Sequence, residues 1–289
     1  MPCNRVGSSR IFVLLLALVC ILLSGNAVAQ TIAKPSKGAK VGTLRESGTS
    51  YGIQLRTNGW GIVGNYMKAH SNDKRRLYQL EIGEIRHPKE IRQSHDYNLV
   101  KDRSSRPFIY GKRNNFYTVH AGYGVMRFLG DKAERNGIEV NLNYVAGPSI
   151  GVAKPYYLEL MYIEGSGLDP VIRAEKYSES NAEKFLSVGS IYGGAGIRHG
   201  WGELQVYPGL HGKASLNFDF SNNNDFIKAV ELGFSGDIFF RDIPLMVVFE
   251  DKDKIPPVSG FSMPDSDKLP VNRNYFISAF ASIQFGQKW

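Results

Sequence analysis

Seven residues suited to acid–base or ligand chemistry stand at alternate positions within otherwise apolar segments. Alternate residues of an extended strand point to opposite faces, so these side chains share one face and their apolar neighbours share the other. We expect them to face the inside of one fold and to pair there, because buried charges need partners. A proton or solute path and a pair of catalytic carboxylates are the two sharper interpretations. The seven residues are Glu81, His120, Glu139, His211, Lys213, Glu231 and Asp237.

A second group of reactive residue types lies close together in the chain. Ser94, His95 and Asp96 follow His87, and a histidine oriented by an aspartate can activate a serine or a water molecule. No serine stands in the Gly-x-Ser-x-Gly turn that exposes a hydrolase nucleophile, and the six histidines are scattered without the spacing of metal ligands. We therefore interpret this group as loop residues and expect no catalytic site, no metal and no cofactor.

Amphipathic strands are the elements that must position these side chains. The clearest example alternates Ile138, Val140 and Leu142 with polar residues, and the last strand runs to Trp289 with Phe285 on its apolar face. Such strands predict an all-β fold, a closed antiparallel transmembrane barrel of about eight strands with polar residues inside. The barrel would have ten strands if residues 156–162 and 245–249 also crossed the membrane as strands. We expect Phe285 and Trp289 to act as a C-terminal assembly signal.

The connections between the predicted strands alternate in length. Three are short and polar (70–74, 131–136 and 221–225), whereas 86–113, 163–206 and 242–273 are long. This alternation puts all long loops on one side, the pattern of outer-membrane barrels with long extracellular loops. Loop 86–113 is basic, and we expect short helices at 180–186 and 197–204 and a flexible joint at 193–196.

The N-terminus predicts export. Arg5 and Arg10 precede the apolar run 11–23, and small residues at 27–29 suit cleavage, so residues 1–29 are interpreted as a signal peptide. Residues 30–49 are interpreted as a flexible periplasmic lead-in and residues 50–289 as the barrel. Both cysteines, Cys3 and Cys20, lie in the signal peptide, which excludes thiol chemistry in the mature chain. Its removal takes away two arginines and no acid, which lowers the formal charge from +8 to +6.

Three segments resemble the small outer-membrane β-barrel proteins of Bacteroidota, a porin-superfamily-like and largely uncharacterised group. They are the stretch from Glu203 to Lys213, the stretch from Asp242 to Met246 and the final residues from Phe285 to Trp289. The resemblance covers roughly residues 50–289. It implies a barrel architecture and no catalytic residue, because that group shares a fold rather than one activity.

The sequence thus favours a non-enzymatic structural, assembly or interaction component of the bacterial outer membrane. The expected partners are outer-membrane lipid and lipopolysaccharide, the barrel-assembly machinery and other envelope proteins, with no nucleic acid. A porin-like channel for small solutes is the alternative, and a lipid-modifying enzyme is the third hypothesis. A secreted soluble barrel is disfavoured, because its apolar stripes would meet water.

Overall fold

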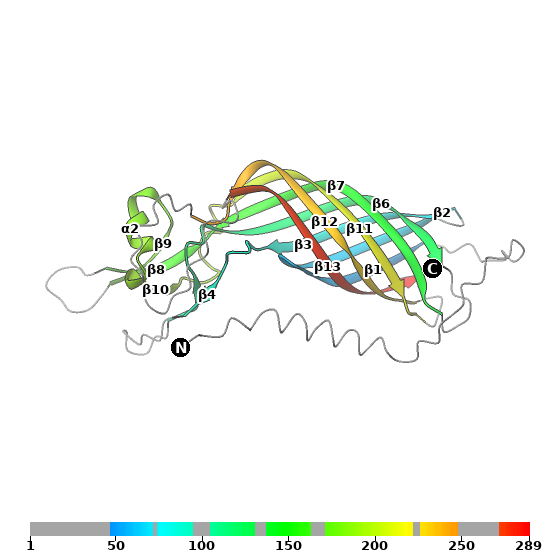
Figure 1. The fold of residues 1–289 in the computed structure, drawn as a ribbon, viewed down its shortest axis with the longest axis horizontal. Coiled ribbons are helices and arrows are strands. Elements are labelled where there is room, and N and C mark those ends of the chain that lie inside the picture. The colour runs from blue at the N-terminus through cyan, green and yellow to red at the C-terminus, as the bar shows by residue number, and fades with distance from the viewer. Residues whose placement is uncertain are drawn as a thin grey trace, which may run out of the picture. The chain divides into compact units, whose positions relative to one another are not determined.

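Eight strands pair antiparallel into a closed barrel, in the order β1-β13-β12-β11-β7-β6-β3-β2, which confirms the predicted fold class (Figure 1). The computed structural model describes residues 47–71, 74–94, 105–130, 137–162, 171–221, 226–247 and 272–289. The barrel strands are β1 (Gly48–Arg56), β2 (Gly59–Ser71), β3 (Lys74–Ile85), β6 (Asn114–Gly130), β7 (Glu139–Pro155), β11 (Gln205–Asp219), β12 (Phe226–Pro244) and β13 (Asn272–Lys288). The predicted signal peptide lies outside the described residues and stays a prediction.

The first and last strands close the ring. β1 pairs with β13 from Gly48 opposite Lys288 to Arg56 opposite Phe280, and β1 pairs with β2 on its other side. The backbone N–H of Trp289 donates to the carbonyl of Ser47 at 2.9 Å. Closure matters because an unpaired strand edge would leave backbone groups unsatisfied in a lipid environment.

The barrel wall is apolar outside and polar inside. On β1, the outward side chains of Tyr51 and Ile53 are 66% and 64% exposed. Ser50, just before them, and Gln54, just after them, are buried. The same alternation runs along the other barrel strands. A band of this kind is stable only against lipid hydrocarbon, so the barrel is a transmembrane one. No helix among the described residues has the length and apolar character needed to cross a bilayer.

The two ends of the barrel differ, as the loop lengths predict. At the turn end, short connections join β2 to β3, β6 to β7 and β11 to β12, and the chain enters β1 and leaves β13 there. At the loop end lie the β1–β2 hairpin and the three long connections. The outward-facing Lys68, Arg127 and Lys228 are exposed and lie near the turn end, where long cationic side chains reach lipid headgroups.

A small cap is built from the long connections. Its three-stranded sheet has the order β10 (Ile191–Gly194), β8 (Tyr157–Tyr162) and β9 (Val171–Lys176). Beside it lie η1 (Glu179–Asn181), the one-turn helix α2 (Ala182–Leu186), η2 (Val188–Ser190) and the two-residue strands β4 (Arg92–Gln93) and β5 (Phe108–Ile109). Phe108, Leu158, Leu160, Phe185 and Ile191 form the fully buried centre of its own apolar core.

The cap corrects several details of the sequence interpretation. Residues 156–162 form β8 of the cap and 245–247 form no barrel strand, so the ten-strand alternative is wrong. Gly193 and Gly194, expected in a flexible joint, are buried in β10, where a side chain would collide with the backbone of Arg106 and Pro107. The predicted helix at 180–186 is present as the end of η1 followed by α2, whereas 197–204 contains turns and no helix. The first strand begins at Gly48, two residues before the predicted boundary.

Replacement of Phe234 by arginine tests the lipid-facing band. Phe234 lies in the middle of β12 with its side chain 68% exposed, so a charge there would lie near the bilayer midplane. We expect Phe234→Arg to lower the free energy of unfolding in lipid vesicles by about 2–4 kcal/mol, as measured by urea titration. The matched variant Phe226→Arg, at the turn end of the same strand, should cost only about 0–1 kcal/mol. Equal costs would contradict the placement of the band.

Candidate functional site

A histidine pair shares one aspartate in the middle of the barrel lumen. His120 lies on β6, His211 on β11 and Asp237 on β12. Oδ1 of Asp237 lies 2.9 Å from Nε2 of His120 and 2.8 Å from Nδ1 of His211. The two imidazole rings are stacked, with centroids 4.1 Å apart and planes inclined by 14°. All three residues are at least 96% buried. A single carboxylate therefore holds two imidazoles side by side.

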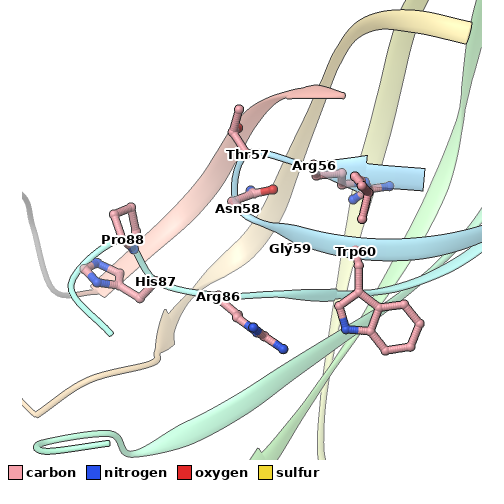
Figure 2. Close-up of a pocket in the computed structure, with 9 residues that line it drawn as sticks. Arg56, Thr57, Asn58, Gly59, Trp60, Arg86, His87 and Pro88 are labelled. Atoms are coloured by element: carbon pink, nitrogen blue, oxygen red, sulfur yellow. The ribbon is translucent and has the colours of Figure 1, made fainter. Parts of the chain in front are cut away.

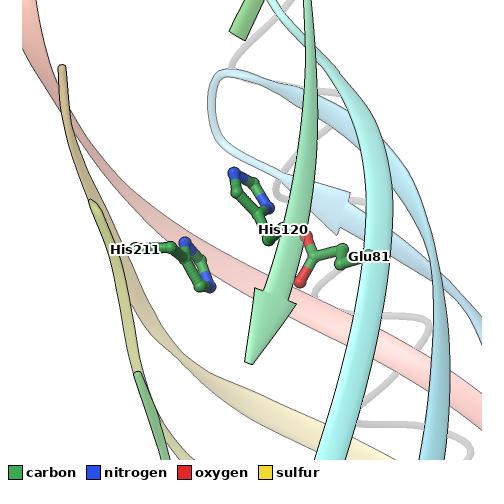
Figure 3. Close-up of side chains that lie close together, drawn as sticks. All are labelled: Glu81, His120 and His211. Carbon is green, nitrogen blue, oxygen red and sulfur yellow. The ribbon is translucent and has the colours of Figure 1, made fainter. Parts of the chain in front are cut away.

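Glu81 of β3, the strand that pairs with β6, completes this group. Strand pairing places Glu81 directly across from His120, and likewise His211 across from Asp237. Figure 3 shows the carboxylate of Glu81 close to the ring of His120, with His211 beside it, and one ligand atom from each of the three lies within 4.8 Å of the others. Arg56 of β1 forms an ion pair with Glu81, and its Nη1 lies 4.0 Å from Oδ2 of Asp237.

Glu231 of β12 is the acceptor for a second set of lumen side chains. Its carboxylate lies 3.3 Å from Nζ of Lys213 and accepts hydrogen bonds from Ser215 and Gln284. Lys213 also donates to Oε1 of Gln54 at 3.2 Å, and Gln54 donates to Glu81 at 3.3 Å. Because Arg56 contacts both Glu81 and Asp237, hydrogen bonds and ion pairs together join the two sets into one network across the lumen.

The seven residues singled out in the sequence all lie buried inside the barrel, and they divide into two places. Six belong to the central network described above. Glu139 lies instead at the turn end, where Lys288 donates to Oδ2 of Asp219 at 2.6 Å and lies 3.8 Å from Oε2 of Glu139. The sequence pattern gives the face of a residue but not its height along the barrel axis.

Packed aromatic rings fill the lumen at the loop end. The ring of Phe116 lies 5.1 Å from that of Phe239, 5.8 Å from that of Phe276 and 6.3 Å from that of Tyr207, measured between centroids. These rings come from β13, β12, β11 and β6, so they cover the stretch of wall from β13 to β6. The full cluster is Ile85, Phe116, Ala153, Tyr207, Phe239, Ile243, Leu245, Met246 and Phe276.

The chain after β12 turns across the mouth and is held there by backbone hydrogen bonds. The carbonyl of Leu245 accepts from the N–H groups of Arg113 and Asn114 at 2.8 and 3.2 Å, and the N–H of Val247 donates to Gly111 at 2.8 Å. The side chain of Asn114 donates to the carbonyl of Pro244 at 2.6 Å. This clamp joins the connection after β12 to the connection before β6, and it carries Leu245 and Met246 into the aromatic cluster.

A third apolar group lines the lumen near the turn end. It consists of Met67, Leu77, Met126, Val145, Ile227 and Ala229, all buried. The central polar network therefore lies between two groups of apolar side chains. Low local dielectric strengthens the hydrogen bonds within the network and makes any unpaired member costly.

Two cations of the described part of the first long connection form ion pairs. Nζ of Lys112 lies 2.7 Å from Oε2 of Glu90 and is buried, and Arg86 pairs with Glu84 of β3 at 2.8 Å. The buried Lys112 therefore does not contribute to the basic surface expected of this connection. Of the hydrolytic group considered in the sequence, His87 is buried and its Nδ1 accepts from the backbone N–H of Lys89. His95 and Asp96 lie outside the described residues.

A hollow of roughly 390 Å³ lies beside the β1–β2 hairpin (Figure 2). Its outer wall is formed by Trp60 and Arg86, which both donate to Oε2 of Glu84, at 2.9 and 2.8 Å. Gly59 is required at the hairpin because a side chain there would collide with the carbonyl of Glu84. The remaining lining residues are Leu55, Arg56, Thr57, Asn58, His87 and Pro88.

Tyrosine hydroxyls tie the first long connection to the second. Tyr110 donates to the carbonyl of Leu186 at 2.6 Å, and burial raises the pKa of Tyr110 to about 12. The hydroxyl of Tyr156 accepts from the N–H of Ile109 at 3.2 Å. The described parts of these two connections therefore hold one another in place and are not independent loops.

Neither a protein-family model nor a curated protein matches this chain. Among solved structures, the attachment invasion locus protein Ail of Yersinia pestis aligns with a TM-score of 0.38 and 11% identity, over 86% of this chain and all of that one. Neisserial surface protein A aligns with a TM-score of 0.34 and 8% identity, covering 84% of this chain and 94% of that chain. The N-terminal β-barrel domain of OprF from Pseudomonas aeruginosa aligns with a TM-score of 0.31 and 10% identity, covering 85% of this chain and 98% of that chain. The resemblance to Bacteroidota barrels stays a prediction.

Removal of the Glu231 carboxylate tests the central network. Glu231→Leu leaves Lys213 buried without its ionic partner, so we expect a loss of about 3–5 kcal/mol in the free energy of unfolding, measured by urea titration in detergent or lipid. Adding Lys213→Met to that variant removes the stranded charge and should recover part of the loss. Additive costs of the two substitutions would contradict the coupling.

Proposed function

We propose that this protein is an integral, non-enzymatic component of the bacterial outer membrane that acts through its folded cap. The supporting observation is the filled lumen: aromatic side chains pack across the loop end, and a connected polar network occupies the centre. A barrel of eight strands leaves room inside for little more than its own side chains. Described parts of the first two long connections instead fold into a cap with its own apolar core.

This arrangement opposes the channel alternative. A solute would have to displace both the ring cluster around Phe116 and the clamp on Leu245, and each is tied to several strands. The lipid-modifying alternative lacks support in the described residues, because His87 is buried and its Nδ1 accepts a local backbone hydrogen bond. The histidines that do meet a carboxylate lie enclosed in the lumen, away from any lipid substrate.

The proposed orientation puts the cap outside the cell. Export through a cleaved signal peptide and insertion by the barrel-assembly machinery would leave the turn end in the periplasm, as in other barrels with long outer loops. Lipopolysaccharide and other envelope proteins are then the partners within reach of the cap. Arg198 of the cap is an exposed cation within reach of anionic groups of these partners.

Conductance measurement tests the closed lumen. The full chain, inserted into a planar bilayer, should leave the current at background, because the interior is filled and clamped. A general porin inserted into the same bilayer provides the positive control. Discrete conductance steps in proportion to the inserted protein would overturn the non-conducting function.

Photo-crosslinking from the cap tests the contact role. A photoreactive residue at the exposed Arg198 should yield adducts with lipopolysaccharide or with an envelope protein in intact cells. The same residue at Leu232, which is exposed on the barrel wall, should yield only phospholipid adducts. The contact role fails if Arg198 gives no more than the Leu232 control.

The C-terminal assembly signal remains a proposal and has its own test. Deletion of Trp289 should reduce the heat-modifiable form in outer membranes several-fold, whereas Trp289→Phe should keep it, because the terminal aromatic group is retained. Unchanged insertion of the deletion variant would show that Trp289 is dispensable. Phe285, 60% exposed on the same outward face, serves as the second position of the signal and is tested by Phe285→Ala.

A further inference from the structure

Three buried imidazole nitrogens in the lumen have no hydrogen-bond partner within the described residues. Asp237 forms a hydrogen bond with Nδ1 of His211, whereas Nε2 of His211 and both ring nitrogens of His120 make none, although Nε2 of His120 lies 2.9 Å from Oδ1 of Asp237. Oε2 of Glu81 is likewise without a hydrogen bond. Buried polar atoms of this kind are rare in folded proteins, and each one costs free energy unless something binds it.

We propose that Glu81, His120 and His211 bind one divalent transition-metal ion of the zinc class. Their ligand atoms already lie within 4.8 Å of one another, and two imidazoles with one carboxylate are a donor set that zinc favours. Asp237 serves as the shared outer carboxylate. Its Oδ1 lies 2.8 Å from Nδ1 of His211 and 2.9 Å from Nε2 of His120, so a proton on each of these nitrogens would leave the other nitrogen of each ring free to bind the ion.

The charges of the surrounding network are compatible with a bound cation. Glu81, Glu231 and Asp237 contribute three negative charges to the centre, and Arg56 and Lys213 contribute two positive ones. The centre is therefore acidic by one charge when both histidines are neutral. Arg56 holds Glu81, but its Nη1 also lies 4.0 Å from Oδ2 of Asp237. When the ion binds the carboxylate of Glu81, the guanidinium of Arg56 can pair with Asp237 instead.

Binding requires a modest rearrangement of the rings. The rings are stacked with centroids 4.1 Å apart, and the ion requires one nitrogen of each ring to turn toward the carboxylate of Glu81, which lies close to the ring of His120 (Figure 3). The bound ion would connect β3, β6 and β11 across the lumen, walls that are not all adjacent in the barrel. An ion bound by the folded state alone stabilises that state, so this is a structural metal of the barrel.

Metal analysis of the folded full chain tests the site. The untagged protein is folded from denaturant into detergent with a slight excess of Zn²⁺ or Co²⁺, free metal is removed, and bound metal is counted by mass spectrometry. We expect about one ion per chain, and at least a roughly tenfold lower content in His120→Ala and His211→Ala. His199→Ala, which removes an exposed histidine of the cap, is the matched control and should keep full occupancy.

Two further readouts keep the test decisive if the alanine variants fail to fold. Co²⁺ in the wild-type barrel should give the intense visible absorption of a four-coordinate site, and Asp237→Asn should weaken the affinity about 10–100-fold while leaving every ligand in place. The proposal is overturned by wild-type protein that folds in the presence of either ion yet retains far less than one per chain. It is equally overturned by His120→Ala and His211→Ala variants that retain as much metal as His199→Ala.

Discussion

Backbone hydrogen bonding in a lipid environment is the constraint on which the whole structure depends. Hydrocarbon offers no partner for a peptide N–H or carbonyl group, so strands can cross a membrane only when every one of them is paired on both sides. Here the pairing of β1 with β13 meets that condition and fixes the ring at eight strands. The apolar exterior and the polar interior follow, because each wall residue must face either lipid or the narrow lumen.

A narrow ring brings a second constraint, since its inward polar side chains have no access to bulk water. They must satisfy one another, and the network around Asp237 and Glu231 largely does so with partners from six strands. The apolar groups on either side of that network shield it from water. Where the network leaves atoms unsatisfied, at the free nitrogens of the histidine pair, it also creates the conditions for binding an ion. The same residues therefore stabilise the barrel interior and offer ligand atoms for an ion.

The sequence predicts the barrel well because the period of two is a local property. Polar residues at every second position and the alternation of short and long connections need no knowledge of distant contacts. The histidine pair could not be predicted in the same way. His120, His211 and Asp237 meet only because strand pairing and tilt set their heights along the axis, and neither is encoded near those residues. The same reason explains why Glu139 lies apart from the other six.

The cap was hardest to predict because its elements are short and depend on one another. The Gly193–Gly194 pair is typical of a loose turn, but both residues are buried in a strand against Arg106. Lys112 belongs to a strongly basic stretch and is nonetheless buried against Glu90. In both cases, contacts between segments far apart in the chain decide the local structure, and a local pattern does not contain them.

The clamp that holds Leu245 against residues 111–114 also has a bearing on the order of assembly. Its partner segments precede β6 and follow β12, so it cannot form until nearly the entire chain has been made. The clamp therefore closes after the barrel strands on either side of it have been made. It ties the first and third long connections together only at the end of assembly.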